Sequence, residues 1–314
     1  MNGERKIEII KPFGEAFELM TNILFRPFNF EKWLIIGFAA FLSGHLSAGG
    51  FNFPFGNWNA RQSSHNLNLS PAFEEWRPWF PIVIVCGATV LLVLVVLFAW
   101  LKARGNFIFT DCIVRNRGAI AGPWREYRRE GNSYFLFSLA VAVCAMITVG
   151  LIAVAIIVPL GLFGQSRTEH EMTPIVIVLF ILFGLLWLCF AIFFALISYF
   201  MIPVMYIRRC RAMDAFWDVA RLIFDNGASF VLFCLFSICL LIGTGMISGI
   251  ATCATCCLAA LPYVGTVILL PVFVCLRAFG LRFIRQFGPE YDVWTGVAAT
   301  APPPATPEPP PLPS

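Results

Sequence analysis

The chain has 314 residues, of which 59% are hydrophobic and 13% are charged, and its formal net charge is +4. A water-soluble globular domain has roughly 45–50% apolar and about 25% charged residues, so this composition excludes that class. The apolar runs are continuous and long, unlike the alternating segments of about ten residues that mark a membrane β-barrel. The sequence therefore predicts an all-α, polytopic transmembrane helical bundle.

Residues 1–29 are expected to form a cytoplasmic N-terminal segment that contains an amphipathic helix. Polar and apolar residues recur at helical spacing on opposite sides, as in helices that lie in the membrane interface. The polar face consists of Lys11, Glu15, Glu18 and Asn22, and the apolar face of Phe13, Phe17, Met20 and Leu24. No cleavable signal peptide is expected, because the segment mixes acids with bases and lacks a compact apolar region.

Residues 30–295 are predicted to form a transmembrane domain of about six spans. A span needs about 20 predominantly apolar residues. The spans are expected at residues 30–46, 80–101, 134–160, 174–205, 229–250 and 258–281. The first is the shortest, and the last two divide one long uncharged stretch at the small and polar segment 251–257, since a single helix would overshoot the bilayer.

Lys and Arg residues are concentrated in alternate segments between these spans. Nineteen of the 22 fall in the N-terminal segment, the second and fourth loops and the C-terminal segment. By the positive-inside rule, both termini are expected in the cytoplasm. No charged residue lies in the core of a predicted span, which disfavours a proton-coupled transporter. Arg104 and Arg277 stand at span ends, where we expect them to snorkel to the headgroups.

A short pattern occurs three times after predicted spans, and it suggests a three-fold internal repeat. An aliphatic residue and an Arg precede a Trp by nine positions, and both side chains are expected to anchor at the interface. The three pairs are Arg115 and Trp124, Arg208 and Trp217, and Arg285 and Trp294.

A second amphipathic helix is predicted after the fourth span, with a shorter and highly charged version at residues 124–130. Its polar face consists of Asp214, Asp218, Arg221 and Asp225, and its apolar face of Met213, Phe216, Ala220 and Ile223. The resulting hypothesis is three units, each an interfacial helix followed by a transmembrane hairpin. The alternative is that these segments are ordinary juxtamembrane linkers.

Two further motifs lie near the fifth span. Gly245 and Gly249 form a GxxxG pattern that favours close helix packing, within the chain or between chains. Cys253, Cys256 and Cys257 form an outer-face thiol cluster, interpreted either as small-residue packing or as a redox pair. The proline-rich tail, residues 296–314, is expected to be disordered and cytoplasmic.

The segments RPFNFEKWLIIGFAAFLSG, ARGNFIFTDCIVRNR and LRFIRQFGPEYDVW resemble an uncharacterised family of bacterial six-span membrane proteins. That family is distantly similar to the membrane domain of glycerophosphoryl diester phosphodiesterases. The resemblance implies a multi-pass domain in the inner membrane of a bacterium. It does not include the soluble catalytic domain, so it implies no activity and no site residues.

No motif for a catalytic, cofactor or metal site is recognised, and the protein is not expected to be an enzyme. The leading hypothesis is a membrane-organising or scaffold protein. Its expected partners are membrane lipids, in particular anionic headgroups on the cytoplasmic face, together with a protein partner or a second copy of the chain, but not nucleic acid. The alternative is a permease or facilitator for a lipid-like or apolar solute.

Overall fold

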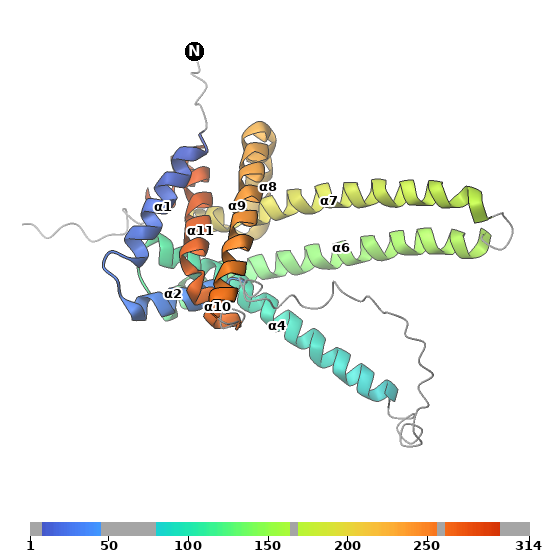
Figure 1. The fold of residues 1–314 in the computed structure, drawn as a ribbon, viewed down its shortest axis with the longest axis horizontal. Helices are drawn as coiled ribbons and strands as arrows, with labels where there is room; N and C mark the ends of the chain where they lie inside the picture. Colours follow the sequence, from blue (N-terminus) through green and yellow to red (C-terminus); the bar gives the residue numbers. More distant parts are fainter. Residues whose placement is uncertain (1–7, 45–79, 164–168, 256–260, 296–314) are drawn as a thin grey trace, which may run out of the picture.

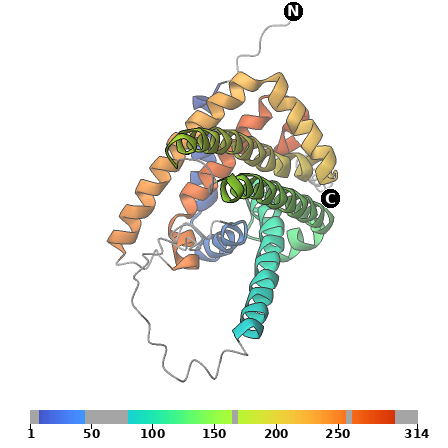
Figure 2. The ribbon, with the colours of Figure 1, turned by 90° about the vertical axis from the view of Figure 1, so that its right-hand side faces the viewer.

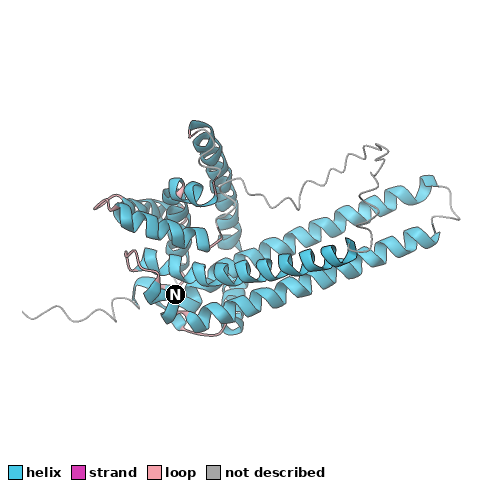
Figure 3. Cartoon of the chain, turned by 90° about the horizontal axis from the view of Figure 1, so that it is seen from below, coloured by secondary structure: helices cyan, strands magenta, loops and turns pink. Residues whose placement is uncertain are grey.

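The computed structural model describes residues 8–44, 80–163, 169–255 and 261–295, which form helices and connecting loops without any strand (Figure 3). The all-α prediction is thus confirmed for the described residues. In chain order the elements are α1 (Ile10–Leu24), α2 (Phe30–Leu42), α4 (Phe80–Val114), α5 (Ala121–Glu126), α6 (Arg128–Phe163), α7 (Glu169–Arg208), α8 (Ala212–Asp225), α9 (Gly227–Ala254), α10 (Pro262–Ile268), α11 (Leu270–Arg285) and the short 3-10 helix η3 (Pro289–Tyr291).

The described chain divides into a packed region and four projecting helices (Figures 1 and 2). We call the packed region the hub; it consists of α1, α2, α5, α8, α10, α11 and the adjoining ends of α4, α6, α7 and α9. In the projecting parts of those four long helices, we call residues 82–98, 139–152, 181–192 and 241–250 the arms. The largest fully buried side chains, among them Phe107, Phe200 and Phe283, all belong to the hub.

The arms are apolar all round and carry no charged residue. Their side chains are exposed in the structure, for example Leu92 at 63%, Met146 at 70% and Leu186 at 67%. Four described helices are long and apolar enough to cross a membrane: Ile82–Val114, Arg128–Ile152, Ile181–Arg208 and Gly227–Ala254. Such surfaces are stable in lipid, where hydrocarbon replaces the missing protein neighbours.

The arrangement of the arms differs from the predicted bundle. In Figure 1, α6 and α7 project in one direction, α4 leaves the hub at an angle and α9 runs across them. The physical reason is that helices with no distinct face, and with hydrocarbon as their expected surroundings, gain little from contact with one another.

In the structure, short helices of the hub occupy the positions of the first and last predicted spans. α2 has 13 residues, a length of roughly 20 Å at 1.5 Å per residue. It buries Ile36, Ala39 and Ala40 against neighbouring helices. The last predicted span is divided between α10 and α11. The six-span count and the three-fold repeat stay predictions.

The hub is held together by aromatic packing among α7, α9 and α11. The ring of Phe233 lies 5.1 Å from Phe200, 5.1 Å from Phe279 and 4.5 Å from Phe283, measured between centroids. Pairs at such separations contribute about 0.5–1.5 kcal/mol each beyond the area they bury. Gly105 permits a further close contact, because a Cβ there would lie 2.5 Å from the carbonyl carbon of Leu42.

The snorkelling predicted for Arg277 is wrong, since its side chain points into the hub and is only 7% exposed. Arg104 is 6% exposed and lies between the rings of Trp100 and Trp124, where α4, α5 and α6 meet. The Nε and Nη2 atoms of Arg277 donate to Thr110 Oγ1 at 3.2 and 2.8 Å, and its guanidinium lies 5.4 Å from the ring of Tyr199. The cause is that α11 is surrounded by other helices, so a side chain on its inner face cannot reach the headgroups.

Candidate membrane-interface site

Three helices of the hub, α5, α8 and α1, dock on a neighbouring helix through the same kind of ion pair. An Arg at or near the C-terminal end of the neighbouring helix pairs with an acid in the docked helix. The pairs are Arg115–Glu126 at 2.9 Å, where α5 meets α4, Arg208–Asp218 at 2.6 Å, where α8 meets α7, and Arg282–Glu15 at 3.5 Å, where α1 meets α11. Because α1 is the first helix and α11 the last long one, the third pair joins the two ends of the described chain.

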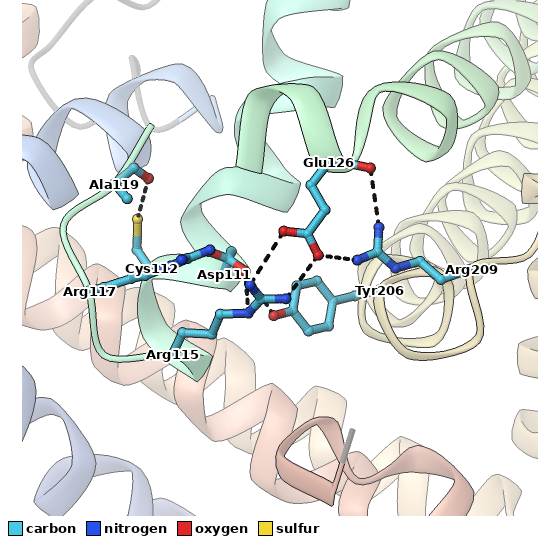
Figure 4. A network of polar contacts seen from close by, with 8 residues as sticks. All are labelled: Asp111, Cys112, Arg115, Arg117, Ala119, Glu126, Tyr206 and Arg209. Carbon is cyan, nitrogen blue, oxygen red and sulfur yellow. Dashed lines mark hydrogen bonds and ion pairs between the residues drawn. The ribbon is translucent and has the colours of Figure 1, made fainter. Parts of the chain in front are cut away.

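Asp111 is the centre of a polar network between α4 and α7 (Figure 4). Its carboxylate is fully buried and lies 3.1 Å from Arg115 Nε and 3.0 Å from Arg117 Nη2. The Tyr206 hydroxyl donates to Asp111 Oδ1 at 3.0 Å. A buried carboxylate is tolerated only when its charge and lone pairs are satisfied in this way.

Glu126 extends this network to a third element, because it accepts hydrogen bonds from both Arg115 and Arg209 (Figure 4). Arg209 Nη1 also donates to the backbone carbonyl of Glu126 at 3.2 Å. Burial alone would raise the pKa of the Glu126 carboxyl, but the hydrogen bonds from Arg209 and Arg115 outweigh burial and lower this pKa below its ordinary value.

The three Arg residues of the repeated pattern all form ion pairs. Besides the contacts of Arg115 described above, Arg208 also pairs with Glu290 at 2.9 Å, and Arg285 pairs with Asp292 at 2.9 Å. The acidic partners were missed in the sequence pattern, although Glu126 and Asp218 follow their Arg by 11 and 10 positions.

The three Trp residues of the pattern occupy different environments. Trp124 is half-buried beside Trp100, and Trp294 is half-buried with the guanidinium of Arg282 4.1 Å from its ring centroid. Trp217 is 58% exposed on the outer surface of α8. Of the three, Trp217 is the one whose ring is free to lie in a membrane interface.

α8 has two apolar faces, not the single one that the sequence predicted. Ala215, Val219 and Ile223 are buried in the hub. On the other side Met213, Trp217 and Phe224 are 56%, 58% and 74% exposed. These three share one face, because their separations of four and eleven residues are close to whole helical turns. We call them the α8 stripe; the polar residues Asp214, Arg221 and Asp225 lie beside it.

Helix α1 repeats this arrangement. Ala16, Met20 and Ile23 are buried, whereas Ile10 is 81% and Phe17 56% exposed. The predicted apolar face of α1 is therefore divided between the hub and the surface, as it is in α8. An amphipathic helix with a single apolar face uses it either for a protein core or for a membrane, but these helices have a face for each.

Both helices lie beside the positions at which arms begin. On α8, Phe216 lies 5.5 Å from Phe137 of α6, and Phe224 lies 5.5 Å from Phe193 of α7. On α1, the ring of Phe13 lies 5.4 Å from Phe236 of α9. The two outer apolar faces are thus next to the segments where the long helices become lipid-like.

Gly245, Gly249 and Cys253 lie further along α9, away from this region. A Cβ added at Gly245 or Gly249 would meet nothing within 4 Å, so the GxxxG pattern makes no packing contact among the described residues. Packing between chains stays a prediction. Cys253 is an exposed free thiol on α9. Cys256, Cys257 and residues 296–314 lie outside the described residues.

Comparison with curated proteins and with solved structures gave no match. The similarity to the membrane domain of glycerophosphoryl diester phosphodiesterases therefore stays a prediction. One family model, described as a family of unknown function (DUF7544), matches residues 7–294, which include all the helices of the hub and the arms. The chain belongs to this uncharacterised family.

Proposed function

We propose that this protein is a non-enzymatic, membrane-organising protein of a bacterial inner membrane. The arms cross the bilayer, which requires α9 to turn from the direction it has in Figure 1 towards that of α6 and α7. The hub rests on the cytoplasmic leaflet with both termini on that side. The outer faces of α1 and α8 enter the interface, and the basic residues of the hub gather anionic lipids around it.

The observation that carries the proposal is the α8 stripe. An exposed face of Met213, Trp217 and Phe224 is unfavourable in water, and burying a large apolar side chain is worth about 1.5–3 kcal/mol. Basic residues near a bilayer surface add attraction to anionic headgroups of about 1 kcal/mol each. The stripe lies beside the segments where the arms of α6 and α7 begin. This supports an orientation in which the arms and the stripe contact the same bilayer.

The test measures lipid enrichment around the reconstituted full chain. In vesicles of phosphatidylcholine with a minority of phosphatidylglycerol, energy transfer from the tryptophans to labelled lipid reports which lipid lies next to the protein. We expect stronger transfer to labelled phosphatidylglycerol than to labelled phosphatidylcholine. The double variant Met213→Glu/Phe224→Glu should lose this preference.

The matched control is Met213→Leu/Phe224→Leu, which keeps the stripe apolar. It should retain the preference of the wild type. Equal transfer to both lipids in the wild type, or an unchanged preference in the glutamate variant, would contradict the proposal.

The facilitator alternative is favoured by one observation, an apolar groove between α7, α8 and α9. Its volume is about 400 Å³, and its lining includes Phe193, Leu196, Phe224 and Leu235. A groove of this character suits an acyl chain. Transbilayer movement of a labelled lipid in vesicles, accelerated by the wild type and slowed by Leu196→Trp, would favour this function over membrane organisation.

A further inference from the structure

A second pocket lies at the corner where α4, α5 and α6 meet. It has a volume of about 470 Å³ and is lined by Trp100, Arg104, Trp124, Arg125 and Arg128. Three of these residues are cationic, two are aromatic and none is acidic. We call this the arginine–tryptophan pocket.

Arg104 is fixed in this pocket by contacts on three sides. Its guanidinium lies 4.5 Å from the ring centroid of Trp100 and 4.8 Å from that of Trp124. Its Nε and Nη2 atoms donate to Asn132 Oδ1 at 3.2 and 3.0 Å, and Trp100 Nε1 donates to the same oxygen at 3.1 Å. The guanidinium is therefore held in one orientation at the wall of the pocket before any ligand arrives.

The charge of Arg104 is not neutralised by a carboxylate anywhere in the described parts of the chain, although the residue is only 6% exposed. Asp111, the acid nearest to Arg104 in sequence, pairs with Arg115 and Arg117. The acids next to the other two arginines of the pocket are also engaged: Glu126 with Arg115 and Arg209, and Glu130 with Arg209 at 3.6 Å. Burying a charge without a partner is costly, so proteins pair such a charge or use it to bind a ligand.

We propose that the arginine–tryptophan pocket binds the phosphate group of an anionic ligand, most directly that of a lipid headgroup. Guanidinium groups match the geometry of phosphate oxygens and donate charge-assisted hydrogen bonds to them. Trp100 lies two residues beyond the arm of α4, so an arm that crosses the bilayer would place the pocket at the depth of the headgroups. The inference deepens the proposed function by naming a ligand and a site, and it rests on that function only for the lipid source of the phosphate.

The test uses the two exposed arginines at the mouth of the pocket, because replacing buried Arg104 could unfold the hub. The full chain is placed in nanodiscs of phosphatidylcholine with a minority of phosphatidic acid, and retained lipid is identified by native mass spectrometry. In parallel, inorganic phosphate is titrated into the protein in detergent by calorimetry. The variant is Arg125→Gln/Arg128→Gln.

The matched control is Arg129→Gln/Arg211→Gln, which removes the same charge from exposed positions that line a different pocket. We expect the pocket variant to weaken binding roughly tenfold or more, because it removes two guanidinium groups that would donate charge-assisted hydrogen bonds to the phosphate. The control should change affinity by about twofold or less.

The outcomes separate the two sources of phosphate. Retained phosphatidic acid that the pocket variant loses supports a lipid site, and binding of inorganic phosphate with the same dependence on the variants supports a soluble anion. Binding of neither probe, or equal weakening by both double variants, would overturn the proposal. Failure of the proposed function is distinguishable, because it appears in a separate measurement. Energy transfer would then be equal for both labelled lipids, or would not change in the glutamate variant of the α8 stripe.

Discussion

The hub and the arms differ in where their apolar side chains find neighbours. In the hub, Phe200, Phe230 and Phe283 are almost completely buried against other rings, and the buried carboxylate of Asp111 has three partners. In the arms, side chains as large as Leu92 and Leu186 remain more than half exposed. The comparison teaches that the hub is stabilised by contacts within the chain, whereas the arms have few such contacts and a surface suited to hydrocarbon.

The arginines of the hub have different kinds of partner at the surface and in the interior. The exposed or half-exposed arginines Arg115, Arg208 and Arg285 have acidic partners. The buried arginines Arg104 and Arg277 are held by neutral groups, namely Asn132 and Thr110, and by aromatic rings. Ion pairs thus fasten helices together at the surface of the hub, whereas Arg104 and Arg277 have no acidic partner in the described parts of the chain.

The largest effect on the hub is expected from Asp111→Ala. Removing the carboxylate leaves two arginines and the Tyr206 hydroxyl without their shared partner, and breaking a buried pair costs about 3–5 kcal/mol. We expect the lower end of that range, because Arg115 keeps Glu126. Urea unfolding in detergent, followed by tryptophan fluorescence, measures the change. Asp225→Ala, at an exposed position, is the control, and equal effects of the two would argue against the network.

A glycine comparison between hub and arm sharpens the contrast. Gly105→Ala places a Cβ within 2.5 Å of the α2 backbone, and such overpacking costs about 1–3 kcal/mol. Gly245→Ala meets nothing within 4 Å and should leave stability unchanged or slightly raised. Thermal unfolding in detergent distinguishes the two. If Gly245→Ala instead dissociates an oligomer, the GxxxG pattern packs between chains.

Surface ion pairs should matter less than either of these. Arg208→Ala removes the pairs with Asp218 and Glu290, and exposed or half-exposed pairs are worth about 0.2–1 kcal/mol each. High salt should reduce the difference between this variant and the wild type. Arg211→Ala, which removes an exposed arginine from the same loop, is the control, and a loss as large as that of Arg208→Ala would show that the ion pairs are unimportant.

The smallest predicted effect is a pH dependence of the hub. Because the folded state lowers the pKa of Glu126, its contribution is fully present above the ordinary carboxyl pKa of about 4.3 and is lost as pH falls through the lowered value. The Glu126→Gln variant should therefore lose less stability than the wild type when the pH falls below about 5. Melting temperatures across this range test the prediction. Glu31→Gln, at an exposed position, should retain the acid dependence of the wild type.

The long apolar helices and both amphipathic helices could be predicted from sequence, because hydrophobic runs and helical spacing are local properties. The inward direction of Arg277 could not, since it depends on helices that are distant in sequence and surround α11. The second apolar face of α8 could not be predicted either. The sequence pattern places Met213 and Ile223 on one face, although the structure exposes the first and buries the second.

The site could be predicted only in part, for a related reason. The recurrence of Arg115, Arg208 and Arg285 is visible along the chain, but the acids that pair with them follow at unequal distances. The pairing of Arg282 with Glu15 joins opposite ends of the sequence, so no local pattern could have shown it. The arginine–tryptophan pocket combines residues of three helices and is visible only in the fold.

The central claim is that the α8 stripe enters the membrane interface while the adjacent face of the same helix remains in water. The most direct test introduces a nitroxide-bearing unnatural amino acid at position 224 or at position 225 of the reconstituted protein, which avoids labelling the 11 native cysteines. Relaxation by oxygen and by a water-soluble nickel chelate then reports the surroundings of each label. The account predicts that oxygen dominates at position 224 and the chelate at position 225. Dominance of the chelate at both positions would contradict it.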